Sequence, residues 1–157
     1  MKDHEHFMRL AIELARENIK SGEGGPFGAV VVKDGVVVGR GANKVVSEHD
    51  PTAHAEVVAI RDACQNLNTF QLDGCIIYSS CEPCPMCLGA VYWSRPDKLF
   101  FAASREDAAR AGFDDAYIYT QLAISVDKRD IKTETLLERE SNEVFEQWIA
   151  SEQKIPY

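Results

Sequence analysis

The chain has 157 residues, 45% hydrophobic and 27% charged, a composition typical of globular domains that excludes a wholly disordered chain or a long coiled coil. Seventeen Lys and Arg against 25 Asp and Glu give a formal net charge of −8, which disfavours a long polyanionic partner such as nucleic acid. No apolar run approaches the roughly 20 residues that cross a bilayer, and the N-terminus lacks a signal-peptide pattern, so we expect a cytoplasmic protein with no membrane partner.

The N-terminal part of the chain predicts a helix followed by a hairpin. Apolar residues recur at helical spacing over residues 7–19, which indicates an amphipathic helix. Two valine-rich runs, 29–32 and 36–38, then flank Asp34–Gly35, a dipeptide typical of a tight hairpin turn.

Helices and strands alternate through the rest of the chain. Asp50 followed by Pro51 has the pattern of an N-cap with proline at the first helical position, so a helix is expected over 52–67. The later elements are expected as strand 75–78, helix 82–94, strand 98–102, helix 105–121 with a break at Gly112, and helix 142–153. The segment 125–138 is ambiguous. This alternation predicts one α/β domain with a largely parallel sheet between helices.

Three of the five cysteines, Cys81, Cys84 and Cys87, fall within seven residues. In a reducing compartment, such clustering favours metal binding or redox chemistry over disulfides. Cys64 and Cys75 stand apart in apolar patterns and are interpreted as small core residues.

Two motifs at predicted helix starts supply a set of metal ligands. His54 opens His-Ala-Glu, and Cys84 and Cys87 lie in Pro-Cys-Pro-Met-Cys. One imidazole and two thiolates suit Zn²⁺, and three protein ligands leave the fourth tetrahedral position for water, as in catalytic sites. Glu56 beside such a site is a candidate for taking and delivering protons.

Other interpretations remain open for the same residues. Cys81 is a candidate fourth ligand of a structural zinc site, and the three clustered cysteines also suit an iron–sulfur or redox site. These interpretations leave Glu56 without a role. Asn43 is also explained as a turn residue, and Phe27 and Trp93 as core packing.

The motifs together resemble those of the cytidine deaminase-like superfamily of zinc deaminases, and within it the guanine deaminase branch of bacteria. The resemblance runs over nearly the whole chain and is carried by residues 25–30, 50–56, 80–90 and 111–115 and by the terminal Tyr157. Several branches share the first three stretches. Residues 112–115 and the aromatic C-terminus favour the guanine deaminase branch.

The resemblance implies a three-layer α/β/α fold with a mixed, mostly parallel five-stranded sheet and helices on both faces. It implies hydrolytic deamination of guanine to xanthine and ammonia, a reaction of purine catabolism or salvage, with one Zn²⁺ per protomer on His54, Cys84 and Cys87. Glu56 then moves protons, and Asp115 assists the leaving amine. The implied substrate-binding residues are Asn43, Phe27, Trp93, Ala55 and Tyr157.

The resemblance also implies a homodimer. The C-terminal segment, about residues 130–157, is expected to be swapped so that Tyr157 closes the partner's site over a small purine base. The alternatives are a tRNA adenosine deaminase, a cytosine or cytidine deaminase, and a zinc-binding scaffold without turnover.

Overall fold

The structure is a computed structural model that describes residues 4–157, and the chain divides into two compact units, 1–115 and 116–157. The first unit contains α1 (His4–Ser21), β1 (Gly28–Lys33), β2 (Val36–Ala42), α2 (Val45–Glu48), α3 (Ala55–Leu67), β3 (Cys75–Cys81), α4 (Pro85–Ser94), β4 (Lys98–Ala103) and α5 (Arg105–Arg110). The second unit contains α6 (Ala116–Ala123), the short 3-10 helix η1 (Val126–Lys128) and α7 (Glu138–Ala150).

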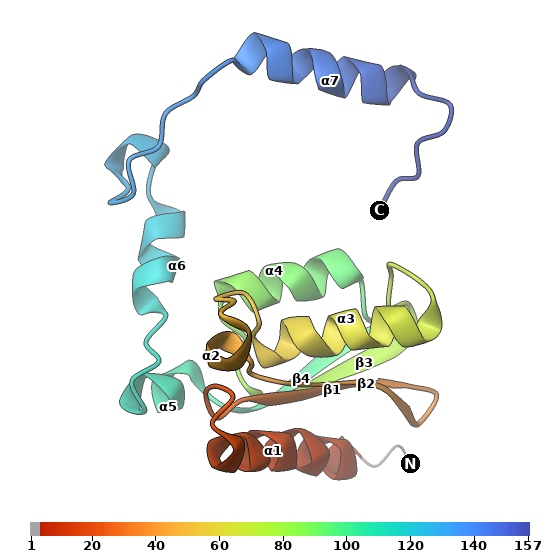
Figure 1. Cartoon of the computed structure of the whole chain (residues 1–157), viewed down its shortest axis with the longest axis vertical. Helices are drawn as coiled ribbons and strands as arrows, with labels where there is room; N and C mark the ends of the chain where they lie inside the picture. Colours follow the sequence, from red (N-terminus) through yellow and green to blue (C-terminus); the bar gives the residue numbers. More distant parts are fainter. Residues whose placement is uncertain (1–3) are drawn as a thin grey trace. The chain divides into compact units, whose positions relative to one another are not determined.

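The first unit has three layers. Its sheet has the strand order β2-β1-β3-β4, with α1 on one face and α3 and α4 on the other (Figure 1). This arrangement confirms the predicted α/β/α fold. Two core clusters fill the spaces between the layers, one beneath α1 and one beneath α3.

The prediction of a mostly parallel, five-stranded sheet was wrong in two respects. The sheet has four strands, and within residues 4–157 no fifth strand follows β4. Strand β1 pairs antiparallel with both β2 and β3, and only β3 and β4 pair in parallel. The reason is that the connection through α3 passes over β1, so that β1 lies between two strands that run opposite to it. Strands β2, β3 and β4 do share one direction, as helix-linked strands were expected to.

The local turn predictions had mixed outcomes. The hairpin is confirmed, with Asp34 at φ 49° and Gly35 at φ 80°, the left-handed conformations that a tight hairpin turn requires. The predicted helix start at Asp50 was wrong, because α3 begins at Ala55 and its N-cap is His54. The Asp50 carboxylate instead accepts hydrogen bonds from the backbone N–H and the hydroxyl of Thr52, closing a local turn before the helix.

Small residues bring α3 close to β2. A Cβ atom at Gly41 would lie 2.2 Å from the carbonyl oxygen of Ala55, and one at Gly39 would lie 2.5 Å from that of Ala59. Glycine is therefore required at both positions for this approach. The close packing fixes the N-terminal end of α3, and with it His54, against the sheet.

The second unit has no buried residue between Ala116 and Tyr157. The predicted break at Gly112 is confirmed, because the backbone there takes φ 92° between α5 and α6. Helix α7 begins and ends a few residues before the predicted range, and four of its apolar side chains are exposed: Val144, Phe145, Trp148 and Ile149. No helix among residues 4–157 is long and apolar enough to span a membrane.

Candidate metal centre

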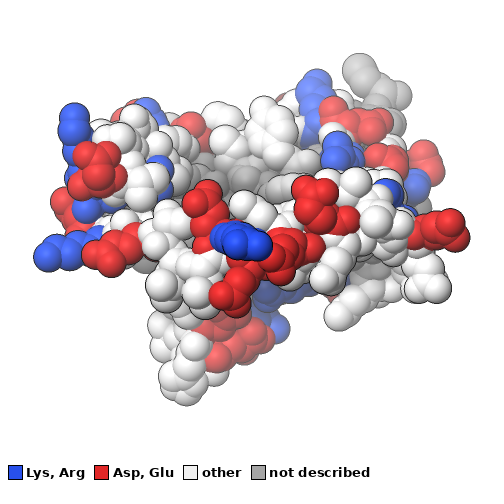
Figure 2. Space-filling model, turned by 90° about the horizontal axis from the view of Figure 1, so that it is seen from above, with Lys and Arg blue, Asp and Glu red and all other residues white. Residues whose placement is uncertain are grey.

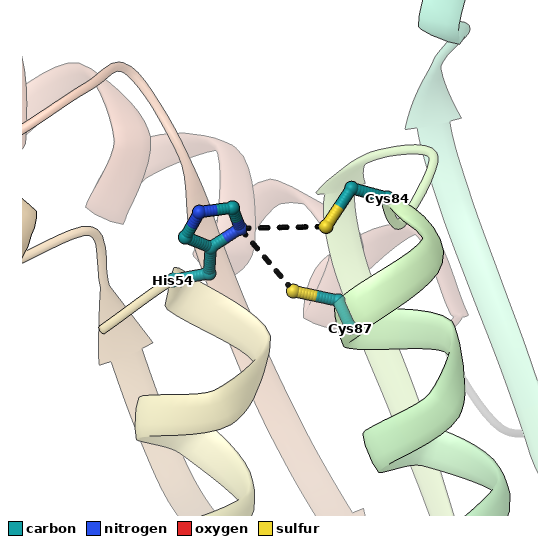
Figure 3. Close-up of side chains that lie close together, drawn as sticks. All are labelled: His54, Cys84 and Cys87. Carbon is teal, nitrogen blue, oxygen red and sulfur yellow. Dashed lines mark hydrogen bonds between the residues drawn. The ribbon is translucent and has the colours of Figure 1, made fainter. Parts of the chain in front are cut away.

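The three predicted metal ligands converge at the N-terminal ends of two neighbouring helices. His54 is the N-cap of α3 and Cys84 is the N-cap of α4, and both have extended backbone conformations. Cys87 lies in the first turn of α4, on the same side as Cys84 (Figure 3). The positive ends of two helix dipoles therefore meet at this point and favour thiolate sulfur.

The distances fit one tetrahedral zinc ion. Nδ1 of His54 lies 3.5 Å from Sγ of Cys84 and 3.4 Å from Sγ of Cys87 (Figure 3). The usual zinc–nitrogen and zinc–sulfur bond lengths place two such ligand atoms about 3.6 Å apart at a tetrahedral angle. The three ligand atoms all lie within 4.8 Å of one another, so these side chains would hold the ion, with Nδ1 of His54 the nitrogen nearest the two sulfurs.

Hydrogen bonds and burial shift the pKa values of all three ligands. A hydrogen bond from the Cys87 thiol and another from His54 lower the pKa of Cys84 to about 4. Donating that bond, together with burial, raises the pKa of Cys87 above its ordinary range. The hydrogen bond with Cys84 raises the pKa of His54. In the metal-free structure hydrogen bonds join the three side chains, and binding of a zinc ion would release the protons of those bonds.

Glu56 reaches the same centre. In mid-helix, residues two apart point in different directions, but His54 precedes the helix in an extended conformation, so both side chains face the site. The Glu56 carboxylate is 6% exposed and accepts a hydrogen bond of 3.0 Å from the Ser79 hydroxyl. Burial raises its pKa, against the opposing effect of hydrogen bonds that include the one from the Ser79 hydroxyl.

Comparison with known proteins identifies the family. The model of the family described as "Cytidine and deoxycytidylate deaminase zinc-binding region" matches residues 1–103. The chain belongs to this family of zinc deaminases. It is therefore a hydrolase of C–N bonds whose His54, Cys84 and Cys87 are positioned to bind one zinc ion.

Individual relatives extend the similarity beyond the metal centre. The deaminase is 51% identical over 146 residues to the guanine deaminase of Bacillus subtilis (strain 168), covering 93% of this chain and 94% of that protein. The X-ray structure of guanine deaminase from Bacillus subtilis has a TM-score of 0.96 at 50% identity and covers 99% of both chains. The tRNA-specific adenosine deaminase of Aquifex aeolicus (strain VF5) is 43% identical over 63% of this chain and 65% of its own.

Cys81 lies outside the ligand set of the deaminase. Its thiol donates a weak hydrogen bond to the carbonyl oxygen of Ser104 at 3.7 Å, and burial raises its pKa to about 11. Among residues 4–157, His54, Cys84 and Cys87 form the only group of three or more such side chains placed to hold a metal. The structure therefore gives no support to a structural zinc site or a cluster that uses Cys81.

Asn43 follows β2 and is held by a network of backbone contacts. Its Oδ1 accepts hydrogen bonds from the backbone N–H groups of Gly25 at 3.2 Å and Val45 at 3.1 Å. The Asn18 amide donates to the Asn43 carbonyl oxygen at 2.8 Å and to that of Gly25 at 2.7 Å. These contacts occupy Oδ1 and leave the side-chain NH₂ group of Asn43 as a donor.

The structure does not bring all predicted substrate-binding residues together. Trp93 is 64% exposed in the last turn of α4, nine residues and about 13 Å along the helix from Cys84. It therefore does not reach the metal centre of its own chain, and the predicted sandwich with Phe27 does not form there. Phe27 instead packs edge-on against Phe113, with ring centroids 4.9 Å apart. Ala55 is fully buried, so its side chain belongs to the core.

Asp115 lies at the end of the first unit, where the charge of the metal ligand Cys84 affects the pKa of its carboxyl. Burial raises its pKa, and the negative charge of the Cys84 sulfur adds to that effect, opposed by Arg105. Tyr157, at the end of the second unit, is 69% exposed.

Proposed function

We propose that this deaminase converts guanine and water to xanthine and ammonia. The observation that carries the proposal is the extent of the similarity to guanine deaminase, which continues through the second unit to the C-terminus. The tRNA-specific relatives are more distant: one is 43% identical over 63% of the chain, and one that covers 96% of the chain is only 33% identical. The geometry supports the same reaction class, because a buried carboxylate lies beside a three-ligand zinc site.

His54, Cys84 and Cys87 would hold the zinc ion. When bound, the ion lowers the pKa of water to about 7 and so supplies a nucleophile at neutral pH. Glu56 would move two protons in turn: it takes the first from water and delivers it to a ring nitrogen of the purine, and it takes the second from the added hydroxyl and delivers it to the amine, which leaves as ammonia. Its burial supports this role, because a raised pKa brings the carboxyl closer to the pH at which it must both accept and donate.

Asn43 would orient the base. Since its Oδ1 is occupied by two backbone N–H groups, the side chain offers a donor to the substrate. Guanine presents acceptors at N7 and O6, whereas adenine carries a donor amino group at C6. A donor at this position therefore suits N7 of either purine, and it favours guanine over adenine where it faces O6.

Asp115 and Phe27 would complete the site. The Asp115 carboxyl, with its pKa raised by burial, is suited to accept a hydrogen bond from the amine that leaves the base. Phe27 is held by its contact with Phe113 and offers an aromatic surface for a planar purine. Stacking of a base on such a ring contributes roughly 1–3 kcal/mol.

We further propose that the protein is a homodimer in which about residues 130–157 are swapped, so that Tyr157 closes the partner's site. Helix α7 supports this, because its apolar side chains, including the 63% exposed Phe145, have no core of their own. The first unit in turn leaves β4 as an edge strand, with Phe101 48% exposed. Closure over the site would exclude water and larger substrates.

All five cysteines are free, in keeping with a reducing cytoplasm.

The second candidate is a tRNA adenosine deaminase, which the similarity to the Aquifex aeolicus protein favours. Such an enzyme needs basic side chains along the path of the phosphate backbone. The chain has a net charge of −8, and on the face shown in Figure 2 Lys and Arg lie among Asp and Glu rather than in one patch. The free base is therefore the preferred substrate.

An ammonia-release panel tests the proposal. Zinc-loaded protein is assayed on guanine, adenine, cytosine, cytidine and an anticodon-stem tRNA, with zinc-free protein as the control. We expect xanthine and ammonia from guanine in equal amounts, and no product without zinc. Turnover of the tRNA or of cytidine without turnover of guanine would overturn the substrate assignment.

A further inference from the structure

Two adjacent serines on β3 face opposite sides of the sheet. Ser80 faces the α1 side, and its Oγ accepts a hydrogen bond from the backbone N–H of Gly28 at 3.0 Å. Ser79 faces the α3 side, in line with Ile77, which belongs to the core beneath α3. Sequence analysis assigned a role to neither serine, because a serine pair at the end of a strand has no distinctive spacing.

The Ser79 hydroxyl lies in an otherwise apolar surface. It is 2% exposed, and its neighbours on that face of β3 are Ile77 and Cys81. A buried hydroxyl requires a hydrogen-bond partner, since its transfer from water is otherwise unfavourable. Its partner is Oε1 of Glu56, at 3.0 Å.

This bond acts on the carboxylate that faces the metal centre. The terminal torsion of a glutamate side chain has a broad energy minimum, so packing along its stem does not set the orientation of the two oxygens. With Oε1 held by Ser79 on the sheet side, Oε2 is the oxygen left for the reacting groups. In the metal-free structure the carboxylate also lies beside Cys87, so the group faces the metal centre.

We propose that Ser79 is a positioning residue, which acts through its hydrogen bond to Oε1 and holds Glu56 in the orientation needed for proton transfer. The inference depends on the proposed role of Glu56 but not on which base is deaminated. Outer partners of this kind at metal sites typically change activity by about 10–100-fold when removed.

The test compares Ser79→Ala, Ser79→Thr and a matched control, Ser94→Ala. Ser94 is also buried, but its hydroxyl donates to the Val91 carbonyl oxygen of its own helix, away from Glu56. For zinc-loaded Ser79→Ala we expect kcat to fall about 10–100-fold, KM to change less than about threefold, and zinc to remain at one ion per protomer. Ser79→Thr restores the hydroxyl and most of kcat, and Ser94→Ala keeps the wild-type kcat.

A crystal structure of zinc-loaded Ser79→Ala gives a second readout. We expect the Glu56 carboxylate to rotate away from its wild-type orientation, and to regain a hydrogen bond in Ser79→Thr. The inference is overturned if Ser79→Ala keeps the wild-type kcat, if only KM changes, or if the carboxylate does not move.

The two proposals fail separately. If the wild type turns over another base but not guanine, the substrate assignment fails and the Ser79 comparison is made on that base. If guanine is turned over and Ser79→Ala is as active as wild type, the positioning role alone fails. If no base is turned over, the crystal structures still test the positioning role, because Ser79→Ala should change the orientation of the Glu56 carboxylate.

Discussion

The two units of this deaminase use the same kind of helix with opposite results. Helix α1 places its apolar side against the sheet, with Phe7 and Ala11 buried. Helix α7 carries a comparable apolar side, yet Phe145 and Trp148 are 63% and 47% exposed. A helix of 13 residues is marginal on its own and depends on packing for its stability. The metal ligands and Glu56 therefore all lie in the first unit, whereas the exposed apolar side of α7 supports the proposal that the second unit packs on a partner chain.

The sharpest way to test the first half of this comparison is Glu56→Gln. If the chemistry lies in the first unit, this change lowers kcat by about 10²–10⁴-fold, because that is what general acid–base catalysis contributes. The amide still accepts a hydrogen bond from Ser79, so the fold is retained. Ammonia release and zinc content, measured on the same preparations, check the prediction. Turnover near the wild-type rate with zinc bound would contradict it.

The same variant carries a prediction about stability and pH. Burial raises the pKa of Glu56 in the folded metal-free protein above its ordinary value. The folded state then binds more protons than the unfolded state between the two pKa values, so this group lowers stability as pH rises through that window. Urea unfolding should therefore show metal-free Glu56→Gln gaining stability relative to wild type from pH 4 to pH 8. A constant difference across that range would contradict the assignment.

Trp148→Asp tests the second half of the comparison. If α7 packs on a partner chain, a carboxylate at this position converts the dimer to a monomer and lowers activity at least about tenfold, because the partner no longer closes the site. Light scattering and ammonia release measure the two effects. Glu146→Gln, an exposed change on the same helix, is the control and should alter neither. A wild-type protein that is monomeric and fully active would contradict the dimer.

Two glycine substitutions compare packed and open surfaces. Gly41→Ala places a Cβ against the backbone of Ala55 and Ala59 and should lower the free energy of unfolding by about 3 kcal/mol. Gly89→Ala, in α4, meets nothing within 4 Å and should raise it by about 0.5–1 kcal/mol. Denaturant unfolding of both zinc-loaded variants measures the difference. Equal effects would show that α3 is not held as closely to β2 as described.

Thiol reactivity gives the smallest and most local effect. In metal-free protein, Cys84, with a pKa of about 4, is a thiolate throughout pH 6–8, so its alkylation rate should change little over that range. Cys81, with a pKa of about 11, should react slowly and about tenfold faster for each pH unit. Mass spectrometry of iodoacetamide adducts measures both rates. Added zinc should protect Cys84, and Cys81 reacting first would contradict the electrostatic description.

The features that sequence analysis predicted correctly are those encoded over short distances. Cys84 and Cys87 are three residues apart at the start of one helix, and His54 precedes another, so these positions made them candidate metal ligands, and Glu56 favoured a catalytic site over the alternatives. The hairpin at Asp34–Gly35 likewise depends on two adjacent residues whose backbone conformation few other pairs adopt.

Two of the features that were missed, the position of β1 and the role of Ser79, depend on residues far apart in the chain, whereas the late start of α3 is local. Strand β1 lies between two strands of opposite direction because the connection through α3 crosses over it. No local sequence pattern predicts that crossing. Asp50 is of a residue type common at N-caps, but its side chain closes a turn with Thr52, and α3 starts at Ala55 instead. Ser79 gained its role only when folding placed its hydroxyl beside Glu56. A serine on the apolar side of a buried strand was the one available signal.

X-ray absorption at the zinc edge of the loaded protein tests whether the zinc ion has three protein ligands and an open position for water. We expect one zinc ion per protomer with two sulfur ligands at about 2.3 Å and two nitrogen or oxygen ligands at about 2.0–2.1 Å, one from His54 and one from water. A first shell of three or four sulfurs, or one without a light atom beyond the imidazole, would contradict an open catalytic position.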